Sequence, residues 1–201
     1  MVTEFLQDSQ ILCSNEKTIM KTNSDQYVVF LRGINVGGHA LIKMTDLKKA
    51  FEKMGFQNVR TLLASGNVIF EAEHANKKVL TREIEPTLEK EFKQDIGVTL
   101  RSLNDLKHLE LIKPFKEIKM TPNIRLYVTF LFGEVQPRTI KIPYATPQEE
   151  FRILYATPTE VFSVLDLSKG KRTPDVMSIL EKEFGSKLTT RNWNTILKIL
   201  L

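Results

Sequence analysis

The stretch YVVFLRGINVGG, residues 27–38, joins an apolar run to a glycine-rich segment. In a strand, Val28 and Phe30 would point to one face and Val29 and Leu31 to the other, so both faces would be apolar. An antiparallel sheet with one face in water alternates apolar and polar side chains instead. The stretch therefore predicts a strand whose two faces are both covered by other parts of the chain.

The residues that follow this strand predict one known order of elements. We expect a strand at 27–32, a helix from Thr45 to Gly55, strands at 59–64 and 67–71, a helix from Asn76 to Gly97 and a strand at 98–101. This β-α-β-β-α-β order is that of a ferredoxin-like unit. Because such a unit leaves one face of its sheet open, we expect the second half of the chain to cover that face.

The second half of the chain predicts a further set of helices and strands. We expect a helix capped by Ser102, strands at 125–132, 151–156 and 160–166, a helix opened by Thr173 and Pro174, and a last helix capped by Thr190. The predicted fold is α+β: a ferredoxin-like half, 27–101, packs against a second, related α/β half, 102–201, that ends in a C-terminal helix. Residues 1–26 predict a flexible extension, with Met20 as an alternative translation start.

Composition favours a globular, cytoplasmic protein. The chain has 201 residues, 42% of them hydrophobic, which is enough for a substantial core. The single cysteine, Cys13, cannot form an internal disulfide, and no run approaches the roughly 18 apolar residues of a membrane span. Residues 27–201 carry 27 Lys and Arg against 20 Asp and Glu, a net charge of +7. This excess is compatible with phosphate-bearing partners and also with an ordinary solvated surface.

Several kinds of site are disfavoured by the sequence. His39, His74 and His108 lack the spacing of metal ligands, and neither a metal nor a cofactor is expected. No G-x-S-x-G motif occurs, and the glycines between 33 and 38 match neither the dinucleotide-binding nor the phosphate-loop pattern. The stretch 65–70 lacks the aromatic residues on which RNA-recognition motifs stack bases, so nucleic acid would be bound through its backbone only.

Three polar segments remain as candidate ligand-binding sites, because their amides, guanidinium groups and loop N–H groups suit a carboxylate or phosphate oxygen. The candidate residues are Arg32, Gly33, Asn35, Gly37 and Gly38; Ser65, Gly66 and Asn67; and Thr190, Arg191, Asn192 and Trp193. Each segment also has a structural interpretation. The first would be a turn tethered by Asn35, the second a hairpin turn, and the third a capped helix with Trp193 in the core.

The segments YVVFLRGINVGG, LLASGNVIF, RLYVTFL and TTRNWNTILKILL together resemble the bacterial domain-of-unknown-function family 1697. The resemblance runs from Tyr27 to the C-terminus and implies an α+β, ferredoxin-like architecture. It implies no activity. The twelve candidate residues fall in the signature segments of that family.

Three functions fit these observations. The first is a binding module in which Arg32, Asn35, Ser65, Asn67 and Arg191 hold a phosphate-bearing small molecule or a nucleic-acid backbone. The second is an enzyme that clamps a small anionic substrate with arginines, although no candidate segment supplies a convincing general base and no catalytic residue is predicted. The third is a protein–protein interaction domain. Binding is favoured because the candidate groups do not titrate near neutral pH.

Overall fold

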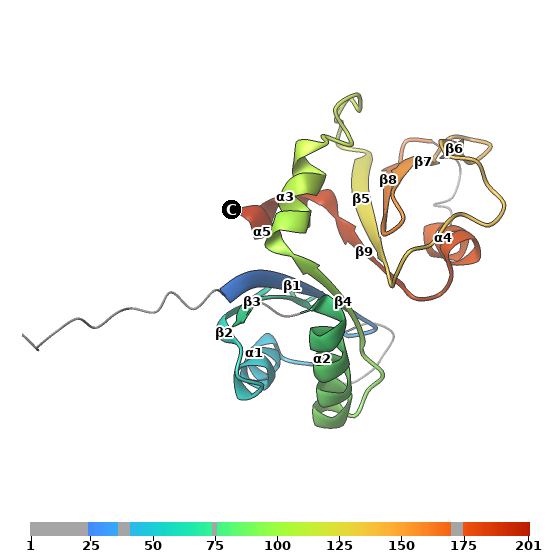
Figure 1. Ribbon diagram of the computed structural model, residues 1–201. Coiled ribbons are helices and arrows are strands. Elements are labelled where there is room, and N and C mark those ends of the chain that lie inside the picture. The colour runs from blue at the N-terminus through green and yellow to red at the C-terminus, as the bar shows by residue number, and fades with distance from the viewer. Residues whose placement is uncertain (1–23, 36–40, 74–75, 170–174) are drawn as a thin grey trace, which may run out of the picture.

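The computed structural model of the chain describes residues 24–35, 41–73, 76–169 and 175–201 (Figure 1). The first half contains β1 (Ser24–Arg32), α1 (Met44–Lys53), β2 (Gln57–Leu62), β3 (Asn67–Glu73), α2 (Lys77–Phe92) and β4 (Gly97–Ser102). Its four strands form an antiparallel sheet in the order β2-β3-β1-β4, which is the ferredoxin-like order. The predicted unit is therefore confirmed. β1 begins at Ser24, so the last three residues of the predicted extension 1–26 belong to this sheet.

The second half also forms an antiparallel sheet. It contains α3 (Leu103–Leu111), β5 (Ile124–Leu131), β6 (Tyr144–Ala145), β7 (Phe151–Ala156), β8 (Glu160–Asp166), α4 (Val176–Phe184), β9 (Leu188–Asn192) and α5 (Trp193–Leu200). The strand order is β6-β7-β8-β5-β9. Without the short β6, this order repeats that of the first sheet, with β5, β7, β8 and β9 in the places of β1 to β4.

The register of the two sheets shows that the halves are related. Val28 pairs with Arg101 in the first sheet, and Val128 pairs with Arg191 in the second. The second half is thus a second ferredoxin-like unit in which the irregular segment between β5 and β7, together with β6, replaces the first helix. An α-helix follows the last strand of each unit, namely α3 after β4 and α5 after β9.

Two predicted helix starts are corrected by the structure. α1 begins at Met44 after Lys43 and not after a Thr45 cap. Thr190 does not cap the last helix either, because it lies within β9, and Asn192 caps α5 by accepting a hydrogen bond from the backbone N–H of Asn194. The strand β9 escapes sequence analysis because its residues are mostly polar. It forms because β5 supplies backbone partners along its whole length.

The core between the two sheets joins the halves. Val29 and Leu31 of β1 pack against α1 and α2 on the outer face of the first sheet, whereas Val28 and Phe30 face the second sheet. The Phe30 and Phe130 rings stack with their centroids 4.3 Å apart. Figure 1 shows α3 and α5 beside the space between the sheets and α4 on the far side of the second sheet. The expectation that the second half covers the open face of the first is confirmed.

A buried carboxylate holds the segment that replaces the missing helix. Glu183 of α4 is buried and accepts hydrogen bonds from the Thr139 backbone N–H at 2.7 Å, the Thr139 hydroxyl at 2.6 Å and the Ile140 N–H at 3.2 Å. The hydrogen bond from the Thr139 hydroxyl, together with those from the backbone, holds the pKa of Glu183 below its ordinary value. The ionised carboxylate therefore stabilises the folded chain.

The Glu183→Gln variant should be less stable than the parent at pH 7, because a neutral amide accepts these bonds more weakly. The pKa of Glu183 is lower in the folded than in the unfolded chain, so its contribution is present above the unfolded value of about 4.3 and is lost as the pH falls through the folded value. Urea unfolding from pH 7 to pH 3 should show the two proteins converging in acid. Glu181→Gln, on the exposed face of the same helix, should follow the parent throughout.

Candidate functional site

The three predicted polar segments meet at one side chain. The Arg191 guanidinium donates from Nε to Asn67 Oδ1 at 2.6 Å and from Nη2 to the Leu31 and Ser65 carbonyls at 2.7 and 3.0 Å. Its Nη1 donates to Thr189 Oγ1 at 2.7 Å and to the Thr190 carbonyl at 3.0 Å. The ends of β1 and β9 and the start of β3 therefore lie side by side.

Arg191 has no free donor for a ligand. A guanidinium carries five N–H groups, and all five of these have protein acceptors. The residue is only 7% exposed, and its guanidinium carbon lies 5.5 Å from the centre of the Phe30 ring. Burial lowers the pKa of Arg191 to about 10, which leaves it positively charged at neutral pH. In this geometry the cation joins the two halves.

The neighbouring predicted residues also have structural partners. Asn35 donates to the Ile42 and Ala64 carbonyls and accepts from the Ile42 N–H, and so closes the loop that follows β1. Arg32 donates from Nη1 to the Ser186 carbonyl at 2.7 Å. Gly66 has φ +75°, and a Cβ there would lie 2.5 Å from Ile34 Cδ1, so only glycine fits.

The other predicted residues lie in a turn, at the start of α5 or outside the described residues. Gly33 has a positive φ of 81° at the turn after β1. Asn192 caps α5, and Trp193 is buried, with its ring 5.3 Å from that of Phe115. Gly37 and Gly38 lie outside the described residues. Asn35 tethers a turn and Trp193 lies in the core, as the structural interpretation predicts, whereas Thr190 does not cap α5.

The related half carries an equivalent arginine. Arg101 of β4 donates from Nε to Glu160 Oε1 at 2.7 Å. Glu160 occupies the position in the second sheet that Asn67, the acceptor of Arg191 Nε, occupies in the first. Its Nη2 donates to the Leu131 and Thr159 carbonyls at 3.3 and 3.0 Å, and its Nη1 donates to the Leu100 carbonyl at 3.0 Å. The guanidinium carbon lies 5.3 Å from the centre of the Phe130 ring, as that of Arg191 lies near Phe30.

We call each of these arginines, together with its hydrogen-bond acceptors, an arginine cluster. The Arg101 cluster lacks one hydrogen bond that the Arg191 cluster has. Thr189 accepts from Arg191 Nη1, but its equivalent Thr99 is only 3% exposed and has no hydrogen-bond partner for its hydroxyl among the described residues. Arg101 uses four of its five N–H groups on protein acceptors in that part of the chain. One Nη1 N–H and one buried hydroxyl are therefore unused, and both residues line the same cavity.

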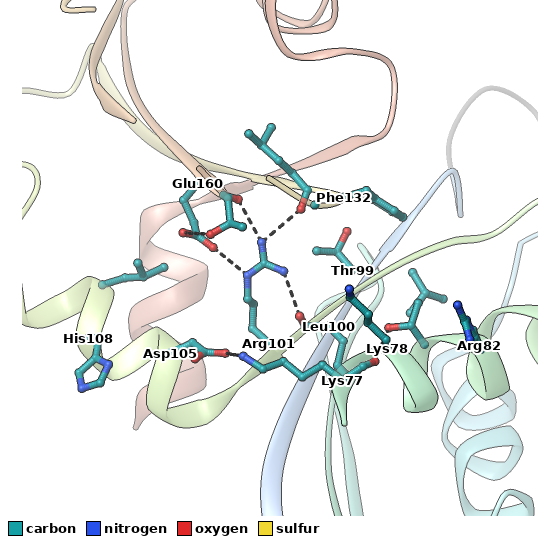
Figure 2. Close-up of a pocket in the computed structure, with 16 residues that line it drawn as sticks. Lys77, Lys78, Arg82, Thr99, Leu100, Arg101, Asp105, His108, Phe132 and Glu160 are labelled. Carbon is teal, nitrogen blue, oxygen red and sulfur yellow. Dashed lines mark hydrogen bonds and ion pairs between the residues drawn. The ribbon is translucent and has the colours of Figure 1, made fainter. Parts of the chain in front are cut away.

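This cavity lies between the two halves and has a volume of about 630 Å³ (Figure 2). α2 contributes Lys77, Lys78, Thr81 and Arg82, and the other walls come from β4, α3, the end of β5 and the start of β8. In the view of Figure 2, Thr99 lies between the Arg101 guanidinium and Lys78. The volume is within the range of pockets that enclose small molecules.

The charges around the cavity leave a positive excess. Lys77 forms an ion pair with Asp105, and Arg101 forms one with Glu160. Lys78 and Arg82 are exposed on α2 and form no ion pair with any residue that the structure describes. Burial opposes ionisation of Asp105, but hydrogen bonds from Lys77 and Ser102 outweigh this effect and hold the pKa of the carboxyl below its usual value.

Residues 24–162 match the sequence model of a family described as proteins of unknown function, DUF1697. The chain belongs to this family. Among solved structures, the DUF1697 chain is similar to the conserved bacterial protein SP0830 from Streptococcus pneumoniae, with a TM-score of 0.60 and 18% sequence identity over 88% of this chain and 97% of that one. This likeness supports the α+β fold. A search among curated proteins gave no significant match.

The described part of this DUF1697 chain has neither a candidate metal-ion cluster nor a helix that could span a membrane. Its His, Cys, Asp and Glu side chains form no group of three or more that could hold a metal ion. None of the helices in the same residues is long and apolar enough to cross a membrane.

The cavity of the DUF1697 chain was missed because its walls come from elements that are distant in sequence. One signal was available in the internal repeat. The stretch TLRS at 99–102 resembles TTRN at 189–192, and FLRG at 30–33 resembles FLFG at 130–133. Comparison of these stretches would have matched Arg101 with the predicted Arg191, and Thr99 with Thr189 near it. It would not have revealed which of the two clusters borders a cavity.

Proposed function

We propose that the chain binds an anionic, phosphate-bearing small molecule in the cavity between its halves. The observation that carries this proposal is the difference between two equivalent clusters. The Arg191 cluster is closed by Thr189, whereas the Arg101 cluster retains a free N–H and the buried, unpartnered hydroxyl of Thr99, a residue that lines the cavity. Buried polar groups without partners are rare in folded proteins, so a ligand oxygen is a reasonable acceptor for both donors.

The charges of the cavity support an anion in preference to a neutral ligand. Lys78 and Arg82 lie four residues apart on α2, so they share one face of the helix, and both line the cavity. Charge-assisted hydrogen bonds from guanidinium and ammonium groups to phosphate are among the stronger polar contacts in proteins. Four cationic side chains against two carboxylates line this space, without counting His108.

The side chains that line the cavity are better suited to binding a ligand than to transferring a proton. The two carboxylates on the wall, Asp105 and Glu160, are both committed to ion pairs and to hydroxyl or backbone donors. A general base needs a lone pair within hydrogen-bond reach of the substrate, and both oxygens of Glu160 and Oδ2 of Asp105 already accept hydrogen bonds from the protein. The cavity therefore favours recognition of a charged molecule without bond chemistry.

The test is calorimetric titration with adenosine monophosphate, phenyl phosphate, inorganic phosphate and a ten-nucleotide RNA at low and moderate salt. We expect a small phosphate to bind and Arg82→Ala to weaken it by at least about tenfold, the value of one lost charge-assisted hydrogen bond. Thr99→Val should also weaken binding. Lys90→Ala, on the same helix but away from the cavity, should bind as the parent does.

Stability measurements separate a ligand role of Thr99 from a structural one. Thr99→Val removes an unpartnered hydroxyl and should leave the free energy of unfolding of the ligand-free chain unchanged or raised. Thr189→Val removes an acceptor of Arg191 and should lower it. Equal affinity of the parent and the Arg82→Ala and Thr99→Val variants for every small phosphate would contradict the proposal. Binding of the RNA alone would point to a nucleic-acid partner instead.

A further inference from the structure

We infer that the ligand of the cavity is amphipathic: a phosphate monoester whose aromatic or other apolar body lies against the wall that carries Phe132. This inference rests on the proposed function and adds the chemical class of the ligand. Its basis is that the lining of the cavity contains apolar residues as well as the lysines and the arginine of α2. The apolar residues of the lining are Val98, Leu100, Leu109, Leu131 and Phe132; the first four are buried, and Phe132 is the one of the five that is partly exposed.

Phe132 has no aromatic counterpart in the related half. The equivalent position is Arg32 at the end of β1, so FLRG in the first half corresponds to FLFG in the second. A Cβ at Gly97 would lie 3.2 Å from Phe132 Cζ, so the absence of a side chain there lets the ring pack against β4. The partly buried ring therefore faces the cavity beside Thr99.

The cavity is much larger than a tetrahedral anion. Its volume of about 630 Å³ suits a molecule of the size that small-molecule pockets enclose. Inorganic phosphate bound at Lys78, Arg82 and Thr99 would leave the partly exposed Phe132 ring in contact with water. An aryl group attached to the phosphate would cover the exposed part of that ring and would gain the free energy of removing apolar surface from water.

A series of ligands with one charged group and increasing apolar size tests the inference. Titration with inorganic phosphate, methyl phosphate, phenyl phosphate and 1-naphthyl phosphate should show affinity rising along the series. We expect phenyl phosphate to bind at least about tenfold more tightly than methyl phosphate, since a ring that buries even part of its surface is worth more than 1.4 kcal/mol. Phe132→Ala should reduce this ratio to near one and leave the affinity for inorganic phosphate unchanged.

Two further variants keep the result interpretable. Phe132→Leu retains an apolar side chain and should preserve part of the ratio, even if Phe132→Ala folds poorly. Tyr155→Ala removes an exposed ring on β7 that does not line this cavity, and the ratio should remain as in the parent.

The outcomes distinguish this inference from the proposed function. Equal affinity for methyl and phenyl phosphate, with binding still dependent on Arg82, would overturn the inference and leave the proposed function in place. A ratio that persists in both Phe132 variants would also overturn it, because the apolar body would then lie elsewhere. Absence of binding by every phosphate in the series would overturn both.

Discussion

The Arg191→Met variant should lose about 3 to 5 kcal/mol of unfolding free energy. Methionine fills a similar volume but donates no hydrogen bond. The acceptors that would be left without a donor include Asn67 Oδ1 and the Leu31 and Ser65 carbonyls, which lie in the interior between the halves. Urea unfolding followed by circular dichroism measures the loss. Arg191→Lys should be almost as damaging, because an ammonium has three donors and cannot span acceptors on three strands.

Arg138→Met provides the matched control. Arg138 is exposed, and its guanidinium makes one long hydrogen bond, 3.4 Å to the Lys182 carbonyl. Its replacement should change the unfolding free energy by less than about 0.5 kcal/mol. If Arg191→Met were no more destabilising than this control, Arg191 would not be a structural link, and a ligand role for this residue would have to be considered again.

The Phe130→Ala variant should lose about 3 to 5 kcal/mol of unfolding free energy, because it leaves a cavity between the two sheets. Phe130 is fully buried, stacks on Phe30 and lies under the Arg101 guanidinium. Since this core is shared by both halves, unfolding should remain a single transition. Circular dichroism and the fluorescence of the single tryptophan, Trp193, which lies in the same core, should give coincident curves.

Leu111→Ala is the control for the shared core. Leu111 is 72% exposed at the end of α3, so its truncation should cost less than about 0.5 kcal/mol. A small loss in Phe130→Ala, or two separate transitions in the parent, would mean that the halves fold independently and that the Phe30–Phe130 stack contributes little.

The duplicated architecture places the same arginine cluster in two different surroundings. Arg191 and Arg101 occupy equivalent positions, and each lies over the phenylalanine of the facing strand. The first cluster has a neutral partner in Asn67 and no unused donor. The second has a carboxylate partner in Glu160 and keeps donors at the edge of a cavity. A closed cluster stabilises the contact between the halves, and an open one is suited to a ligand.

Much of the fold could be predicted because the relevant signals are local. Alternation of apolar residues, glycine stops and the Ser102 cap each involve a few neighbouring residues, and the elements expected in the first half were found. The strand β9 was not predicted, because Leu188–Asn192 carry polar side chains whose partners belong to other elements. Without β9, the second ferredoxin-like order was not visible, although the relation of the halves was expected.

The candidate site was predicted less completely. Local sequence was sufficient to group polar residues at the ends of β1, β3 and β9 and to predict that they are special, because glycines with positive φ and clusters of directional donors stand out in a sequence. Only the tertiary structure decided which of their donors are free, since this depends on which carbonyls other segments bring to them. Arg191 meets five acceptors, and Arg101 meets four beside a cavity. That difference comes from packing between the halves, which no single stretch of the chain contains.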